Sequence, residues 1–241
     1  VHQGIVDFND APQAWANWQR GYDFYDEGTL VWLDVDSKLR ELSGGKRSLD
    51  DFARRFFGGS NGTVETRTYG ADDVVAALQG VQAHDWAGFL RARLDGHGPG
   101  APLDGLARGG WKLVYNETPN AAIADVEGDE GFDDFSYSLG LKIARDAGKV
   151  NEVSWGSPAY RAGLAKDTHL VAVDGMAYSA QRLKLAISAA KTSKQPLSLL
   201  VKQGESYRTL QVDYRDGLRY PHLERVAGTP DRLMQLLSPR K

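Results

Sequence analysis

The sequence of 241 residues contains no cysteine, and this absence excludes two kinds of site. Without thiols the chain can form neither a disulfide framework nor a thiolate metal site. The absence fits the cytosol, and it equally fits an oxidising compartment in which a free thiol would be a hazard. It therefore leaves the compartment open.

A strong charge of one sign and a long apolar run are also absent. The formal net charge is −3 at pH 7, from 29 basic and 32 acidic residues, so we expect no broad surface for nucleic acid or anionic lipid. No apolar run is long enough to span a bilayer. The sequence begins at Val1 without a methionine or a signal peptide, which indicates a processed product or a piece of a longer protein.

The histidines lack the spacing of a zinc helix. A His-Glu-x-x-His motif places two zinc ligands on one face of a helix, and a third ligand follows downstream. No histidine here has a second histidine four residues away, so we expect no metal ligands in this chain. The histidines are His2, His84, His97, His169 and His222.

The acidic residues 125–130 lack the sixth-position glycine of a calcium loop, and we expect a solvated acidic linker there.

The residues up to about 95 predict a series of helices. The run 30–42 is apolar on all sides at first and on one side later, which predicts a helix that is buried where it begins. That beginning lies directly after residues 25–28, which are Tyr-Asp-Glu-Gly. Three further helices are expected to begin near side chains that suit helix N-termini, at Ser48, Asp72 and Asp85.

The pattern changes after the glycine- and proline-rich stretch 96–102, which we expect to be a loop or hinge. Short runs with strand composition, separated by turns, then replace the helical spacing. A single longer helix is expected at about 180–190, before a hairpin that turns at 203–206. The chain should therefore be multidomain, with a helical part followed by a mainly-β part. The other expected strands lie at 111–117, 138–144, 149–155 and 169–175.

The second half resembles a PDZ domain over roughly 80–90 residues, a normal size for a small domain. The resemblance rests on the order of several short motifs, and one position departs from it: Lys166 stands where PDZ domains often have glycine before Asp167. That departure concerns a turn and not the peptide groove. The motifs are Ser138-Leu139-Gly140-Leu141, Gly156-Ser157-Pro158-Ala159, Ala162-Gly163-Leu164 and Val173-Asp174-Gly175.

The PDZ resemblance implies a peptide groove. The backbone N–H groups of Leu139, Gly140 and Leu141 would point at a terminal carboxylate. The strand at Lys142 and Ile143 would be an open edge that accepts a peptide as an added strand. The facing wall would come from the helix at 180–190, with Leu183 and Ile187 on one face. The alternative is that the fold is present while the groove is closed or occupied by the protein itself.

The first half resembles the glycyl aminopeptidase family, which consists of gluzincin zinc metallopeptidases with a thermolysin-like catalytic domain and a C-terminal PDZ domain. The resemblance rests on the segments 22–58, 72–78 and 84–96, and on the order of a helical part before a PDZ part. It implies that the hydroxyl of Tyr25 stabilises the oxyanion of the tetrahedral intermediate. Glu27 stands where lysine is common in the wider clan. The alternative is that Tyr25 only packs where the helix begins, with its hydroxyl at the surface.

Together the two resemblances imply a domain order. The helical C-terminal portion of a thermolysin-like catalytic domain would occupy 1–110, and a connecting strand with an acidic linker would occupy 111–134. A PDZ domain would follow at 135–216 and a C-terminal tail at 217–241.

The implied function is that of the C-terminal fragment of a zinc-dependent aminopeptidase, which lacks the zinc helix and is inactive alone. Zinc would belong to the full-length parent, and this chain would carry no cofactor. The expected partners are the upstream catalytic domain of the same protein and a peptide or protein C-terminus at the PDZ groove. The resemblance also implies a bacterial protein that is periplasmic or secreted. The alternative function is a non-catalytic PDZ interaction module that binds protein C-termini on a helical platform.

Overall fold

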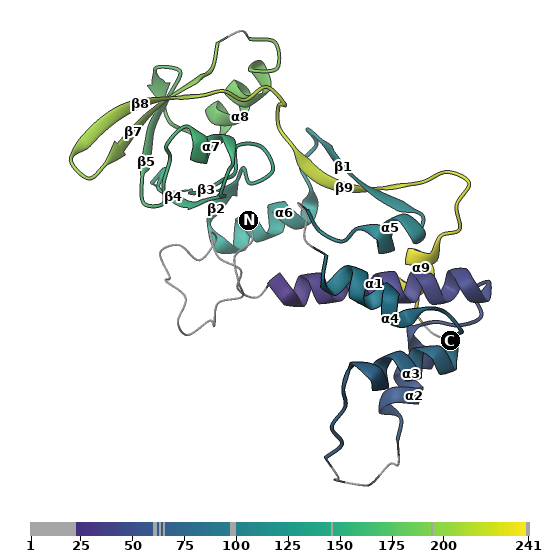
Figure 1. Cartoon of the computed structure of the whole chain (residues 1–241). Helices are drawn as coiled ribbons and strands as arrows, with labels where there is room; N and C mark the ends of the chain where they lie inside the picture. Colours follow the sequence, from purple (N-terminus) through teal and green to yellow (C-terminus); the bar gives the residue numbers. More distant parts are fainter. Residues whose placement is uncertain are drawn as a thin grey trace. The chain divides into compact units, whose positions relative to one another are not determined.

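The computed structural model describes residues 23–59, 62, 64, 66–96, 100–145, 147–193 and 195–239. Across this described part the fold mixes helices α1–α9 with strands β1–β9 (Figure 1). The chain forms two compact units, which we call the helical unit (23–113 and 223–239) and the sheet unit (114–222). No helix in the described part is both long and apolar enough to cross a membrane.

Local signals explain where the helices of the helical unit begin. Asp51 Oδ2 accepts a hydrogen bond from the Ser48 N–H at 3.0 Å, and Ser48 Oγ accepts one from the Asp50 N–H at 3.3 Å, which forms a capping box at the helix start predicted near Ser48. Asp85 caps the last of the three predicted helices by accepting from the Gly88 N–H at 2.9 Å. The helices of this unit are α1 (Asp23–Ser43), α2 (Leu49–Phe57), α3 (Ala71–Val81), α4 (Trp86–Leu94), α5 (Asp104–Arg108) and α9 (Arg232–Leu237).

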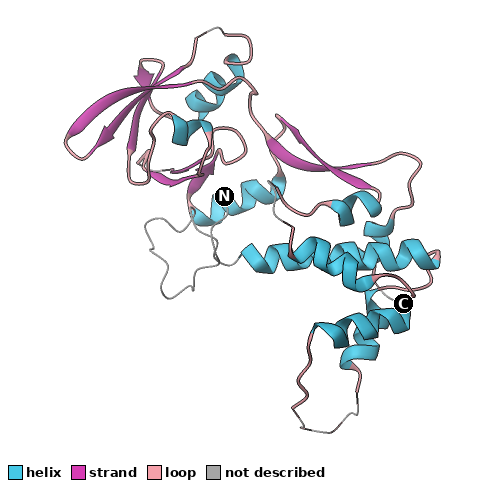
Figure 2. Ribbon diagram, viewed as in Figure 1, coloured by secondary structure: helices cyan, strands magenta, loops and turns pink. Residues whose placement is uncertain are grey.

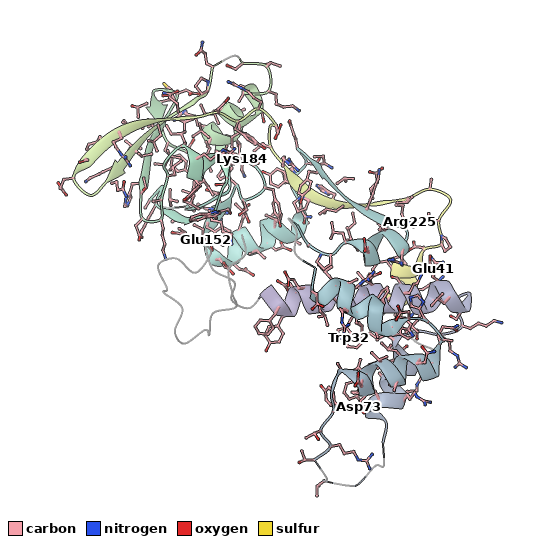
Figure 3. All side chains as sticks on the ribbon, viewed as in Figure 1. Trp32, Glu41, Asp73, Glu152, Lys184 and Arg225 are labelled. Carbon is pink, nitrogen blue, oxygen red and sulfur yellow. The ribbon has the colours of Figure 1, made fainter. Side chains whose placement is uncertain are left out.

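The core of the helical unit is formed by side chains of α1, α2, α3 and α4. Trp86, almost fully buried, packs with residues of α1, α2 and α3, and Trp32 (labelled in Figure 3) packs against the same core. Burial of these large side chains supplies the main stabilising term. The buried members are Val35, Leu39, Phe52, Ala77, Leu78, Trp86 and Phe89.

The sequence predicted that α1 is buried where it begins, and this was wrong. Residues 25–28 lie within the helix and not before it, and Phe24 and Tyr25 are 42% and 66% exposed. The deepest part of α1 is the polar stretch 34–37. It can be buried because cations neutralise its carboxylates: Asp34 accepts hydrogen bonds from Arg93 at 2.5 Å and Arg108 at 2.8 Å.

The sheet unit is built from two antiparallel sheets and three helices in the described part (Figure 2). The sheet orders are β2-β3-β4 and β6-β5-β7-β8, and the predicted turn at 203–206 closes the β7–β8 hairpin. The elements are α6 (Ala121–Glu130), β2 (Phe132–Asp134), β3 (Leu141–Ala144), β4 (Val150–Val153), α7 (Pro158–Arg161), β5 (His169–Val173), β6 (Met176–Ala177), α8 (Ala180–Ala189), β7 (Leu197–Gln203) and β8 (Ser206–Val212).

The segment that we expected to be a solvated acidic linker contains a helix. Asn120 caps α6 by accepting from the Ala122 N–H at 2.9 Å, and Gly131 ends the helix with a left-handed φ of 70°. The Glu127 carboxylate faces inward and is buried. Local capping and one satisfied inward carboxylate therefore outweigh the unfavourable acidic composition.

Strands β1 (Trp111–Asn116) and β9 (Tyr220–Arg225) pair with each other (Figure 1). The division of the chain into two units falls within both strands, after Leu113 and after His222. The Val226 N–H donates to Gly110 O, and Lys112 pairs with Glu224, so the two strands run antiparallel. The expected C-terminal tail thus contains β9 and α9. Trp111 Nε1 donates to Asp231 Oδ1 at 2.9 Å, which fastens the start of α9 within the helical unit.

Candidate functional site

Tyr25 lies on the exposed first part of α1. Its ring centroid is 4.5 Å from that of Phe24, and its carbonyl accepts a hydrogen bond from Thr29 Oγ1 at 2.8 Å. In the part of the chain that the structure describes, no cluster of three or more His, Cys, Asp or Glu side chains could hold a metal ion. The oxyanion role of Tyr25 stays a prediction.

Most of the predicted groove residues lie in the core of the sheet unit. Gly140 is buried and Lys142 is half-buried, with its Nζ 3.3 Å from Glu152 Oε2 on β4. The structure brings all of the predicted groove residues into or next to one core, but it covers their side chains. The fully buried side chains are Leu139, Leu141, Ile143, Leu183 and Ile187.

The backbone N–H groups of the predicted carboxylate loop converge on a carbonyl of the same chain. Phe135 O accepts from the N–H groups of Ser138 at 3.1 Å, Gly140 at 3.0 Å and Leu141 at 3.5 Å. The Phe135 N–H in turn donates to Leu141 O at 2.8 Å. Successive N–H groups aimed at one point form a concavity that suits a carboxylate or a carbonyl oxygen. Here a main-chain carbonyl fills it.

The predicted open edge of β3 is closed, and this expectation was wrong. β3 pairs antiparallel with β4 on one side and with β2 on the other, in the register Phe132↔Ala144, Asp133↔Ile143 and Asp134↔Lys142. The physical reason is that an unpaired strand edge leaves N–H and C=O groups without partners, and the neighbouring residues 132–134 supply them. The alternative of a groove occupied by the protein itself fits this pairing.

Sequence reasoning missed Phe135. Its side chain is 1% exposed and belongs to the same core as Leu141 of β3 and Leu183 of α8. Lys184 of α8, labelled in Figure 3, has its Nζ 5.9 Å from the centroid of the Phe135 ring. A usable signal was the aromatic residue three positions before the loop, at the end of a short Phe-Asp-Asp-Phe run.

Two charged side chains hold the outer side of β2. Glu127 Oε1 of α6 accepts a hydrogen bond from the Asp134 N–H at 2.7 Å, so a buried carboxylate satisfies a backbone N–H on the outer edge of β2. Arg145 donates to Phe132 O at 3.1 Å and lies 3.4 Å from Asp133 Oδ1. Charge-assisted hydrogen bonds of this kind are stronger than neutral ones.

Gly140 is required where it stands. Its φ of 76° is left-handed, and a Cβ there would lie 2.2 Å from Ser157 Cβ. Ser157 cannot move easily, because its Oγ accepts from the Tyr160 N–H at 3.1 Å and so caps α7. The loop is thus held close against the start of α7.

Tyr214, in the core beside this loop, provides a pH test. Burial, and secondarily the charge of Asp216, raises the pKa of Tyr214 to about 12, whereas an unfolded tyrosine titrates near ~10. The folded state therefore keeps the proton longer, and this contribution to stability is complete below pH ~10 and is lost as the pH rises from about 10 to about 12. Tyr214→Phe should make the free energy of unfolding fall less steeply across this window, measured by urea titration at several pH values. If the free energy of unfolding depended on pH equally in both proteins, the raised pKa of Tyr214 would be contradicted.

Comparison with solved structures now gives the fold a context. The chain is similar to the crystal structure of an aminopeptidase N family protein from Idiomarina loihiensis, with a TM-score of 0.64 and 18% sequence identity. The match covers 92% of this chain and 37% of that protein. The fold is that of part of an aminopeptidase N family protein. At this identity the similarity extends to the fold alone, and this chain spans just over a third of that protein's length.

A second similarity concerns a smaller protein. The chain matches the crystal structure of the HtrA3 PDZ domain bound to a phage-derived ligand (FGRWV), with 17% identity over 47% of this chain and 92% of that one. The TM-score is 0.24, a level that does not establish a shared fold. A scan against protein-family models and a search of the curated proteins found no match.

Proposed function

We propose that this chain is the C-terminal portion of a zinc-dependent, aminopeptidase-like metallopeptidase of the glycyl aminopeptidase type. The observation that carries the proposal is the fold similarity to an aminopeptidase N family protein over 92% of the chain, through both units. The sequence motif around Tyr25, which lies in α1 of the helical unit, also supports it.

In this proposal Tyr25 contributes a neutral hydrogen-bond donor to the reaction. A phenol aimed at the developing oxyanion stabilises the transition state more than the ground state, and so raises the turnover number. The exposed position of Tyr25 on α1 leaves its ring accessible from outside the helical unit. A rigid helix, whose later turns are fixed by the Asp34 ion pairs, would hold the hydroxyl in one place.

Zinc would supply a Lewis acid to such a reaction. The described residues of this chain do not fit a zinc site, because they contain no suitable ligand cluster. We therefore assign the metal to another part of the parent protein and derive no step through it.

The test is Tyr25→Phe in the full-length protein that contains this chain. Removal of the hydroxyl should lower kcat and kcat/KM together by about 10²-fold, because an interaction made only in the transition state is lost. The measurement is steady-state hydrolysis of aminoacyl p-nitroanilides, with binding of a ground-state product unchanged.

Tyr69→Phe is the matched control, since Tyr69 is a similarly exposed tyrosine of the same unit, at 63%. It should leave both constants unchanged. Equal turnover numbers for wild type and Tyr25→Phe would remove Tyr25 from the mechanism, and a parent protein without a zinc-ligand motif would end the peptidase proposal.

The second candidate function, peptide recognition by a PDZ-like sheet unit, is favoured by one specific observation. Three backbone N–H groups of the loop 138–141 converge on a single acceptor oxygen next to a paired strand. With an open strand edge beside them, such N–H groups would capture the terminal carboxylate of an extended peptide that binds by strand addition. Such a module would position substrate within the peptidase or recruit a partner. Binding of C-terminal peptides by the 241-residue chain, lost on amidation of their carboxylate, would support it.

A further inference from the structure

In the folded chain, residues 132–135 occupy the edge of β3 and the N–H groups of the loop 138–141. Residues 132–134 run antiparallel to β3, and the residue that follows them, Phe135, ends this stretch at the loop. An added peptide strand that pairs antiparallel with β3 and ends at the same loop would take the same direction and the same hydrogen-bonding groups. The two cannot occupy that edge together.

Phe135 combines the two features by which a peptide end is recognised. Its carbonyl oxygen accepts the converging N–H groups of Ser138, Gly140 and Leu141, as one oxygen of a terminal carboxylate would. Its aromatic side chain is buried with the core residues of β3 and α8. A full carboxylate at this position would carry a negative charge, and Lys184 of α8, whose Nζ lies 5.9 Å from the centroid of the Phe135 ring, has the complementary sign.

We propose that the groove predicted between β3 and α8 is a self-occupied peptide site, in which residues 132–135 are the internal ligand. The external ligand that competes for it is an extended peptide that ends in an aromatic residue with a free carboxylate. This inference rests on the proposal that the sheet unit recognises peptides.

Two side chains outside the site, Glu127 and Arg145, hold the internal ligand in place, and we call this pair the latch. The side chains of Glu127 and Arg145 bond to the outer side and the start of β2, through the Asp134 N–H, Phe132 O and Asp133. Neither belongs to the hydrophobic core of the sheet unit. Removing both should favour local release of 132–135 while the core residues of β3 and α8 stay unchanged.

The experiment compares the wild-type chain with Glu127→Ala/Arg145→Ala. The probe is the peptide Glu-Gly-Phe-Asp-Asp-Phe, which repeats residues 130–135 and ends in a free carboxylate. Because closure by the internal segment reduces the apparent affinity by the open fraction, the latch variant should bind the probe about tenfold or more tightly than wild type. Amidation of the peptide should abolish binding. Hydrogen exchange at 132–135 should be faster in the variant.

The matched control is Asp129→Ala/Arg208→Ala, which removes one exposed acid and one exposed base from the same unit. It should bind the probe no better than wild type. Phe135→Ala is a second route to the open site, and its folding is checked by the exchange protection of β7 and β8.

The outcomes separate the two proposals. Equal and carboxylate-dependent binding by wild type and latch variant would overturn self-occupation and leave peptide recognition standing. No binding by the latch variant, although hydrogen exchange shows 132–135 released, would overturn both. Slow exchange at 132–135 in wild type together with tighter binding by the variant would support both.

Discussion

Asp34→Ala is expected to lower the free energy of unfolding of the helical unit by about 3–5 kcal/mol, because two part-buried arginines lose the buried carboxylate that they share. The Asp34 side chain is 2% exposed and bonds Arg93 at 2.5 Å and Arg108 at 2.8 Å. Arg93 also stacks over the Phe89 ring, with Cζ 3.4 Å from the centroid, so its guanidinium cannot easily turn to solvent. Denaturant titration followed by hydrogen exchange in α1 and α4 measures the loss.

Glu41→Ala is the matched control on the same helix. Its carboxylate pairs with Lys38 at 2.8 Å and lies 3.7 Å from Arg108, but it is 41% exposed. The hydrogen bond from Lys38 holds the pKa of Glu41 below its usual value, yet exposed pairs contribute only about 0–1 kcal/mol. Equal costs for the two substitutions would contradict the view that burial of Asp34, and not the number of ion pairs, sets the effect.

Gly140→Ala should destabilise the sheet unit by about 2–5 kcal/mol, since a left-handed φ costs roughly 1–2 and overpacking adds roughly 1–3. Both terms act at this residue, because its φ is 76° and the new Cβ would meet Ser157 Cβ at 2.2 Å. Relief of this contact would move the loop, which should weaken the hydrogen bonds to Phe135 O and speed hydrogen exchange at 138–141.

Gly156→Ala isolates the first of these terms. Its φ is 69°, and no atom lies within 4 Å of a Cβ built there. It should cost only the roughly 1–2 kcal/mol of the left-handed backbone. If thermal or urea unfolding gave the same loss for both variants, the close contact of the loop with α7 would have no energetic role.

Sequence reasoning succeeded where the deciding interactions are local. The capping residues Ser48 and Asp85 bond to N–H groups two or three residues away, so their helices could be predicted from short patterns. It failed for α1, because Asp34 is neutralised by Arg93 and Arg108, which lie 59 and 74 positions away. No local pattern predicts that a polar stretch will be the most buried part of a helix.

The same distinction applies to the candidate site. The loop motif at 138–141 was predicted by resemblance, and the structure places its N–H groups together. The occupant was missed because Asp133 and Asp134 suggested a solvated segment. Asp133 is buried beside Arg145, and Glu127 accepts from the Asp134 N–H; both contacts follow from the tertiary arrangement and not from the adjacent sequence. Tyr25 differs from both: its oxyanion role was predicted by resemblance, and no contact of the described residues tests that role.

The pairing of β1 with β9 has a consequence for synthesis on the ribosome. All of the sheet unit, 114–222, emerges before β9 is complete and before α9 can reach α1. The helical unit, although most of its residues are made first, obtains its last helix only after the whole sheet unit has been made. We expect the sheet unit to fold while the helical unit is still incomplete, which reverses the usual order in which the earlier region finishes first.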